Sequence, residues 1–172
     1  MSGRVFEALF AVALACCTAG CSFHPLYARA GPGAGGQQVF NSIYVEPVDG
    51  ERAGYELRNS LIDLLEGAER PQLALYRLKV TVKQTIEGTA VQTNGSITRY
   101  SYTMVANYEL SDIHSGKDVT KGTESTVSGY DVVASPYATL VAQQDAQKLG
   151  ARDIADRIRI DLGVYFSKRS SS

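Results

Sequence analysis

Two long segments of this chain alternate apolar and polar side chains, and no other feature limits its fold as strongly. Within residues 73–86, every second residue from Tyr76 to Val82 is apolar, and the residues between them are polar or cationic. Residues 98–110 repeat the pattern, with tyrosines among the apolar positions. A period of two is typical of a β-strand with one buried and one solvated face. We therefore predict two strands in a sheet that is apolar on one side only.

Turn signals and a third strand surround these two segments. Asn94-Gly95 lies between them, and this dipeptide is a strong signal for a β-hairpin. A second loop, 111–117, contains Gly116 and leads into residues 119–130, which are rich in Thr and Ser. Threonine favours β-structure, so we predict a third strand there, less buried than the first two.

Two other segments have helical periodicity. Within residues 51–65, leucines recur at spacings of three and four, which places them on one face of a helix. Ser135-Pro136 begins a longer helical segment that ends near Phe166. Its predicted apolar stripe consists of Ala142, Ala146, Leu149, Ala151, Ile154, Ala155, Ile158, Leu162 and Tyr165. We expect both helices to bury their stripes against the apolar side of the sheet.

An extended segment over residues 39–45 precedes the first helix, so the predicted order is β-α-β-β-β-α. A strand, a helix and a second strand favour a parallel crossover, and the hairpins favour antiparallel pairing of the later strands. We predict an α+β fold, a two-layer sandwich in which two helices cover one face of a mixed four-stranded sheet.

The N-terminal residues are predicted to be a targeting signal. Arg4 precedes an apolar run over residues 8–15, which is too short to cross about 30 Å of hydrocarbon as a helix. Small residues then lead to Cys21, which suits cleavage directly before this cysteine and its acylation. The alternatives are cleavage of an ordinary secretory signal near Ala19 and lipidation at Cys16 or Cys17.

We therefore divide the chain into four parts. Residues 1–20 are the signal peptide, and residues 21–38 are a lipidated N-terminus followed by a flexible, glycine-rich tether. Residues 39–167 form a single α+β domain, and residues 168–172 are a disordered tail. Acyl methylenes inserted into a bilayer contribute about 0.8 kcal/mol each, so a multiply acylated cysteine is a stable membrane anchor.

The composition and the reactive side chains argue against several functions. The net charge of −1 gives no basis for nucleic-acid binding, which uses a basic surface. His24 and His114 are the only histidines, and neither belongs to a cluster with metal-ligand spacing. The chain has neither the nucleophile motif of a hydrolase nor a nucleotide-binding glycine loop. The sequence therefore predicts a protein that is not an enzyme and that binds no metal or cofactor.

Residues 21–27 read Cys-Ser-Phe-His-Pro-Leu-Tyr, and this start resembles that of the LptE family of lipopolysaccharide-assembly lipoproteins, in its alphaproteobacterial form. The resemblance continues through Arg58-Asn59-Ser60-Leu61 in the first helix and Tyr100-Ser101-Tyr102 after the hairpin. A long C-terminal helix follows a loop with Pro136. The family fold, two helices on one side of a mixed four-stranded sheet, is the one predicted above.

The resemblance implies an outer-membrane lipoprotein that faces the periplasm. Members of the family plug the lumen of the LptD β-barrel, assist its assembly and bind lipopolysaccharide on its way to the outer leaflet. In enterobacterial relatives, basic residues near the hairpin tip contribute to lipid binding. This chain departs from them, because no basic residue directly precedes Asn94 and the nearest cations are Arg99 and Lys83.

Two sets of residues are candidates for contacts with these partners. Cations on the polar side of the strands suit the phosphates and acidic sugars of lipopolysaccharide, although a solvated strand face is the alternative interpretation. They are Arg77, Lys79, Lys83 and Arg99. The hairpin tip, which consists of Thr93, Asn94 and Gly95, suits contact with a polar barrel lumen. The alternative interpretation is an ordinary surface loop.

A second hypothesis is a periplasm-facing lipoprotein module that binds an amphiphile without any barrel partner. A large apolar cavity between the helices and the sheet would favour this module. A filled core would favour the barrel partner instead.

Overall fold

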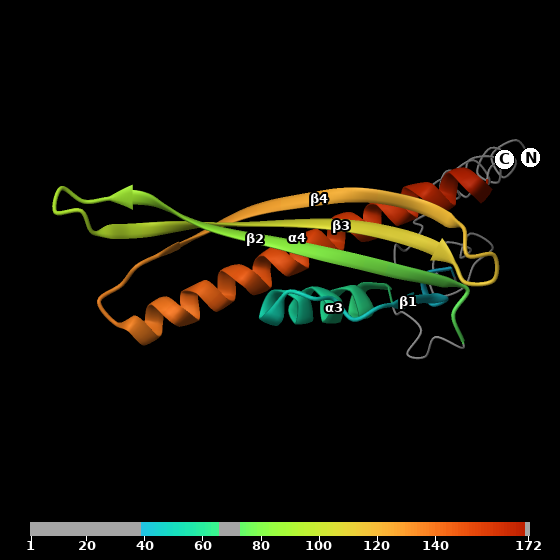
Figure 1. Cartoon of the computed structure of the whole chain (residues 1–172), viewed down its shortest axis with the longest axis horizontal. Helices are drawn as coiled ribbons and strands as arrows, with labels where there is room; N and C mark the ends of the chain where they lie inside the picture. The colour runs from blue at the N-terminus through green and yellow to red at the C-terminus, as the bar shows by residue number, and fades with distance from the viewer. Residues whose placement is uncertain (1–38, 66–72, 171–172) are drawn as a thin grey trace, which may run out of the picture. The chain divides into compact units, whose positions relative to one another are not determined.

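The computed structural model describes residues 39–65 and 73–170 of the chain. The predicted signal peptide, Cys21 and the tether lie outside the described residues. In chain order the elements are β1 (Ile43–Val45), α3 (Glu51–Leu65), β2 (Tyr76–Val91), β3 (Ile97–Asp112), β4 (Asp118–Asp131) and α4 (Pro136–Ser170). This is the predicted order, and Figure 1 shows its arrangement.

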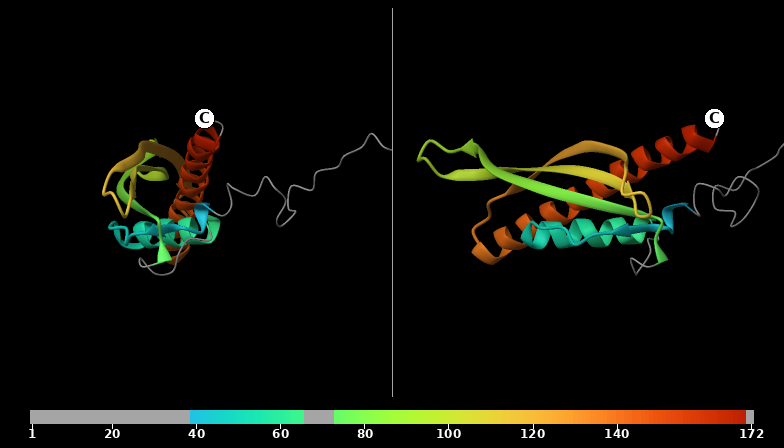
Figure 2. Two further views of the ribbon diagram at one scale, coloured as in Figure 1. Left: turned by 90° about the vertical axis from the view of Figure 1, so that its right-hand side faces the viewer. Right: turned by 45° about the vertical axis from the view of Figure 1, so that its right-hand side comes forward.

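The four strands form one sheet in the order β1-β2-β3-β4. β1 pairs with β2 in parallel, whereas β3 is antiparallel to both β2 and β4. Both helices lie on the same side of this sheet (Figures 1 and 2). The predicted α+β fold, with two helices against a mixed four-stranded sheet, is confirmed.

The alternation in β2 and β3 separates the two faces of the sheet as expected. On β3, Tyr102 and Met104 have no exposed surface, and the residues on either side of them are partly exposed. On β2, Leu78 is fully buried between the exposed Arg77 and Lys79. Because side chains two residues apart share one face of a strand, one face joins the core and the other stays open to solvent.

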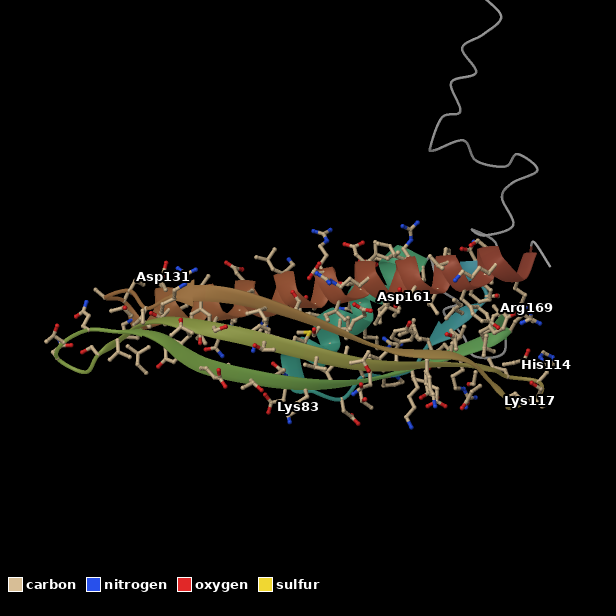
Figure 3. All side chains as sticks on the ribbon, turned by 90° about the horizontal axis from the view of Figure 1, so that it is seen from above. Lys83, His114, Lys117, Asp131, Asp161 and Arg169 are labelled. Carbon is tan, nitrogen blue, oxygen red and sulfur yellow. The ribbon has the colours of Figure 1, made fainter. Side chains whose placement is uncertain are left out.

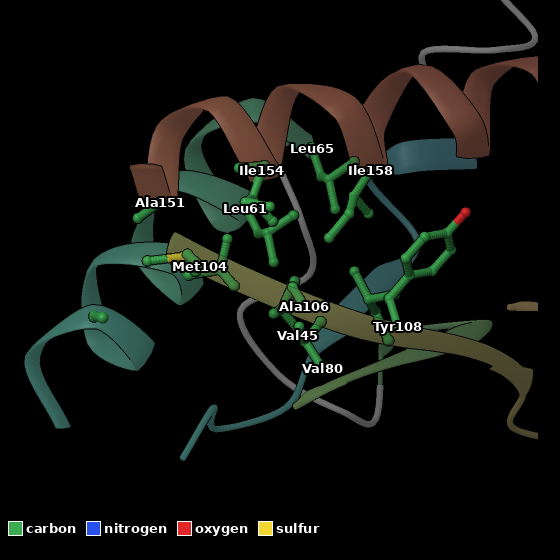
Figure 4. Packing of buried hydrophobic residues seen from close by; sticks show 14 of the residues in the cluster. Val45, Leu61, Leu65, Val80, Met104, Ala106, Tyr108, Ala151, Ile154 and Ile158 are labelled. Carbon is green, nitrogen blue, oxygen red and sulfur yellow. The ribbon is translucent and has the colours of Figure 1, made fainter. Parts of the chain in front are cut away.

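The helices fill the buried side. Leu57, Leu61 and Leu65 form a fully buried stripe on α3. Figure 4 shows side chains from both helices packed toward β3. The buried residues of α4 are Ala146, Ala151, Ile154, Ala155, Ile158, Leu162 and Phe166. At about 25 cal/mol per Å² of apolar area removed from water, this layer is the main source of stability in the domain.

The stripe predicted for α4 is wrong at one position. Leu149 is 64% exposed, and the neighbouring Gly150 is buried instead. A Cβ atom at Gly150 would lie 3.3 Å from Tyr102 Cε1 and 3.4 Å from Thr126 Cγ2. Periodicity favours a large apolar residue on the buried face, but the helix approaches the sheet so closely here that glycine fits better.

The end of α4 also differs from the prediction. The helix continues to Ser170 and so includes residues 168–170, which the sequence assigned to a disordered tail. The Phe166 ring packs near Phe40 and Tyr76, with ring centroids 6.3 and 5.3 Å apart, respectively. This contact anchors the last turns, and the basic residues there suit the negative end of the helix dipole.

The prediction of an extended segment over residues 39–45 is right only for its second half. Val39 and Phe40 are helical, a turn follows, and β1 has three residues. Ser42 Oγ closes this turn by donating a hydrogen bond to the Val39 carbonyl at 2.7 Å. A local bond from a serine side chain to the backbone competes with the extended conformation, and apolar periodicity does not reveal it.

Candidate functional site

The candidate functional surface is the face of the sheet that the helices leave uncovered, and we call it the open face. It consists of the odd-numbered residues within 77–87 of β2, 99–109 of β3 and 121–131 of β4. The strand registers align these residues in rows across the sheet. Figure 3 shows Lys83 on this side, whereas Asp161 of α4 lies on the opposite side.

Three of the predicted site residues, Arg77, Lys79 and Lys83, lie along β2 on the open face. Arg77 is already paired, because its Nε lies 3.4 Å from Glu46 Oε1. Lys79 and Lys83 make no ion pair with any carboxylate of residues 39–65 and 73–170. The two lysines are therefore the cations of β2 that are available to a ligand.

Arg99 lies on the same face but near the hairpin. Its Nη1 is 2.9 Å from Asp131 Oδ1. Along β3 it is six residues from the partner of Lys83, which corresponds to about 20 Å. A depression of about 240 Å³ in this region is lined by Thr89, Arg99, Tyr100, Ser101, Val127, Ser128 and Gly129. The structure thus separates Arg99 from the lysines of β2.

Another cation, which the sequence analysis did not single out, lies in the same row as Lys79. Glu109 of β3 is opposite Lys79 on one side and opposite Lys121 of β4 on the other. The two lysines are therefore two strands apart, about 10 Å between backbones. Neither ammonium group forms an ion pair with Glu109 or another described carboxylate. One carboxylate between two lysines leaves this row with a net positive charge.

A depression of about 410 Å³ lies beside this row. The row next to Lys79, Glu109 and Lys121 is uncharged and consists of Thr81, Asn107 and Thr123. Within it, Thr123 Oγ1 donates a hydrogen bond to Asn107 Oδ1 at 2.7 Å. We call this hollow the lysine depression. It is lined by Lys79, Thr81, Asn107, Tyr108, Glu109, Lys121, Gly122 and Thr123.

The predicted contact residues at the hairpin tip, Thr93, Asn94 and Gly95, form a tight turn. The N–H of Gly95 donates to the Gln92 carbonyl at 2.9 Å, and the N–H of Gln92 donates to the Ser96 carbonyl at 2.8 Å. Gly95 has a φ of 83°, which favours glycine. All three residues are exposed, so the tip presents polar groups at one end of the sheet.

On the side away from the open face, a polar contact joins β3 to α4. Tyr108 Oη donates a hydrogen bond to Asp161 Oδ2 at 2.9 Å. The ring crosses Gly122 of β4, where a Cβ atom would lie 2.6 Å from the Tyr108 hydroxyl. Burial, and then the hydrogen bond to Asp161, raises the pKa of Tyr108 above its ordinary value, so the phenol remains a donor.

Glu124 of β4 also faces α4. Its carboxyl group lies within hydrogen-bonding reach of Asp161. Burial, and then the contact with Asp161, raises the pKa of Glu124, while the nearby Arg157 opposes this rise. These charged groups belong to the contact between α4 and β4 and are not part of the open face.

Within residues 39–65 and 73–170, no cluster of three or more His, Cys, Asp or Glu side chains could hold a metal ion. His114 is exposed in the turn between β3 and β4, and its backbone N–H donates to Asp112 Oδ1 at 3.0 Å. None of the helices in the described part of the chain is both long and apolar enough to cross a membrane.

Known proteins resemble this chain in both sequence and fold. Residues 40–162 match the family model described as LptE, lipopolysaccharide-assembly. An uncharacterized protein of Rickettsia prowazekii is 26% identical over 161 residues, which cover 94% of this chain and 98% of that protein.

Two solved structures share the arrangement of elements. A protein of Caulobacter crescentus, described as a lipoprotein, aligns with a TM-score of 0.64 and 29% identity over 78% of this chain and 97% of its own. Rare lipoprotein B of Shewanella oneidensis aligns with a TM-score of 0.56 and 12% identity over 75% of this chain and 97% of its own. At 12% identity, the second likeness shows the fold alone.

Proposed function

Because this chain belongs to the LptE family of lipopolysaccharide-assembly proteins, we propose that it plugs the LptD β-barrel of the outer membrane. In this role it assists assembly of the barrel and takes part in lipopolysaccharide transport to the outer leaflet. The family is a non-enzymatic lipoprotein family of the bacterial envelope. The proposal therefore rests on surfaces that bind partners rather than on a catalytic centre.

The observation that carries this proposal is the difference between the two faces of the sheet. Leu57 and Leu61 of α3 and Ile154 and Ile158 of α4 have no exposed surface, so the space between helices and sheet is filled (Figure 4). The open face, in contrast, is mostly polar and charged, with threonines, serines, lysines and an asparagine, and its valines are Val105 and Val127. A filled core favours a protein that acts through its exterior, and a polar exterior matches the polar lumen of a barrel.

The hairpin tip is the second element of the proposed barrel contact. Thr93, Asn94 and Gly95 protrude with β2 and β3 beyond α3 (Figure 1). Their side chains and backbone groups offer hydrogen bonds without an apolar patch. We propose that the tip inserts into the polar interior of the barrel.

The proposed membrane attachment is through acyl chains on Cys21, with the domain facing the periplasm. Residues 21–38 provide the tether between this anchor and the domain. The proposed lipopolysaccharide contacts are the cations of the open face. They are Arg77, Lys79, Lys83 and Arg99. Since the two arginines already contact carboxylates, we expect the two lysines to contribute more to the binding of phosphate groups.

Purification of the tagged, full-length chain from outer membranes tests the barrel proposal. A photo-crosslinking residue at Thr93 should form a covalent adduct with the LptD barrel, identified by mass spectrometry. The same residue at Ser115, in the turn at the other end of the sheet, is the matched control and should give a weaker or different adduct. Recovery of the chain from outer membranes without any barrel would refute the proposal.

A further inference from the structure

We propose that the lysine depression is a binding site for a phosphorylated saccharide, with Lys79 and Lys121 holding the phosphate group between them. This inference depends on the proposed function only for the natural source of the ligand, the phosphorylated sugars of lipopolysaccharide. The site itself follows from the placement of two cations, one carboxylate and a row of neutral polar groups in the middle of the open face.

The two lysines supply the attraction for an anion. They lie on either side of Glu109, one strand away in each direction, and neither makes an ion pair with a described carboxylate. Both ammonium groups carry donors on flexible stems, so they can converge on an oxyanion between them. A phosphate dianion would accept a charge-assisted hydrogen bond from each of them, and such bonds are stronger than neutral ones.

The neighbouring row supplies contacts to a sugar. Thr81, Asn107 and Thr123 place two hydroxyl groups and an amide along the floor of the depression. The Asn107 carbonyl oxygen accepts from Thr123, which directs the amide N–H groups of Asn107 toward other acceptors. Groups of this kind match the hydroxyl groups of a saccharide, which both donate and accept hydrogen bonds, whereas a bare phosphate can use only their donors.

Glu109 gives the site selectivity. Its carboxylate stands between the two lysines, where it repels the phosphate group of either ligand. It can also accept a hydrogen bond from a sugar hydroxyl, which only the saccharide offers. Removal of this charge should therefore affect the two kinds of ligand differently. A volume of about 410 Å³ also lies within the range of small-molecule sites, about 300 to 1,000 Å³.

The two arginines of the open face are not part of this site. Arg77 is paired with Glu46, and Arg99 is paired with Asp131 near the hairpin. Lys83 lies on the same face as Lys79, four residues along β2, and does not line the depression. We therefore assign the phosphate contact to Lys79 and Lys121, which come from two different strands.

Calorimetric titration of the full-length chain in detergent, at low salt, tests this site. The probes are the phosphorylated oligosaccharide of lipopolysaccharide freed of its acyl chains, the same oligosaccharide after phosphatase treatment, and inorganic phosphate. We expect Lys79→Gln and Lys121→Gln each to weaken binding of the phosphorylated oligosaccharide about tenfold. Lys148→Gln, which removes an exposed lysine of α4, is the matched control and should bind as the wild type does.

Glu109→Gln provides a test of opposite sign. This variant should bind inorganic phosphate more tightly than the wild type, because a like charge has been removed. All four positions are exposed, and an unchanged unfolding midpoint verifies that each variant is folded. Unchanged affinity in Lys121→Gln would overturn the proposal, as would equally tight binding of the phosphatase-treated oligosaccharide. Equal affinity for inorganic phosphate and the phosphorylated oligosaccharide would refute the saccharide contacts.

The barrel experiment separates this inference from the proposed function. If the oligosaccharide fails to bind but the wild-type chain still crosslinks to the barrel, only the lysine depression is refuted. If the oligosaccharide binds as expected but no barrel is recovered, the depression stands and the plugging role is refuted.

Discussion

At the scale of single residues, Tyr108 and Gly122 form a pair in which the small residue makes room for the large one. The Tyr108 ring lies over the position where a side chain of residue 122 would begin and reaches Asp161 on α4. Glycine weakens a strand by about 0.5–1 kcal/mol relative to alanine. The hydrogen bond between Tyr108 of β3 and Asp161 of α4 offsets this local cost. It depends on the glycine, because the Tyr108 ring occupies the space that a side chain at residue 122 would fill.

Gly122→Ala should destabilise the domain by about 1–3 kcal/mol. The new Cβ atom would lie within 2.6–2.7 Å of the Tyr108 ring and hydroxyl, so the ring must move and its hydrogen bond to Asp161 is disturbed. Urea unfolding monitored by circular dichroism measures the change.

Two further variants separate the causes of this effect. Tyr108→Phe keeps the ring but removes the hydroxyl, so we expect a smaller loss of about 1 kcal/mol. Ser125→Ala, at an exposed position of the same strand, should change stability by less than about 0.5 kcal/mol. If the Gly122→Ala protein is as stable as the wild type, the packing of the Tyr108 ring does not require a glycine at position 122.

At the scale of elements, the contact between α4 and β4 is polar as well as apolar. Glu124 of β4 faces Asp161, Asp153 and Arg157 of α4, and Tyr108 of β3 lies nearby through its bond to Asp161. Burial and then Asp161 raise the pKa of Glu124 above its ordinary value of 4.5. The folded protein therefore binds a proton at this position more tightly than the unfolded chain does.

This raised pKa gives the stability of the domain a pH dependence of known sign. Below the unfolded pKa of 4.5, Glu124 is protonated in both states and its contribution is fully present. As the pH rises through the higher folded pKa, the folded state must ionise the group beside Asp161, and this contribution is lost. Glu124→Gln should therefore gain stability relative to the wild type as the pH rises from about 4 to 7.

Urea midpoints of both proteins across this pH range test the prediction. The lowered pKa values of Asp153 and Asp112 act in the opposite direction. The contribution of Asp112 is present in both proteins and cancels in the difference, whereas Asp153 interacts with Glu124 and is part of the measured effect. Glu87→Gln, which removes an exposed glutamate of β2, is the control. A constant stability difference between Glu124→Gln and the wild type at every pH would contradict the assignment.

At the scale of the whole molecule, the lipid anchor decides where the domain works. Cys21→Ala should abolish acylation and shift the protein from the membrane to the soluble fraction, because a tether alone has no affinity for the bilayer. Membrane fractionation and mass spectrometry of the mature N-terminus measure both effects. Cys17→Ala is the matched control and should leave acylation and location unchanged. Normal membrane recovery of Cys21→Ala, with loss in Cys17→Ala, would move the anchor to residue 17.

Much of the fold could be predicted from local patterns. The alternation around Leu78 and Tyr102 correctly separated the two faces of the sheet, and the leucines of residues 51–65 correctly placed α3. Asn94-Gly95 correctly located the hairpin. These patterns are informative because each reflects a period or a backbone conformation that the residues themselves impose. The prediction that Leu149 is buried was wrong because the distance between α4 and the sheet depends on tertiary packing and not on the local sequence.

The sequence by itself therefore determined which side of β2 and β3 faces water, including that Lys79 and Lys83 are exposed. Only the tertiary structure decided which of these residues are neighbours. The register of β2, β3 and β4 places Lys79, Glu109 and Lys121 in one row, and it leaves Arg99 ten residues from Glu109 along β3, which corresponds to about 33 Å. Side-chain periodicity is set within one strand, whereas register is set between strands by turns and by packing against the helices.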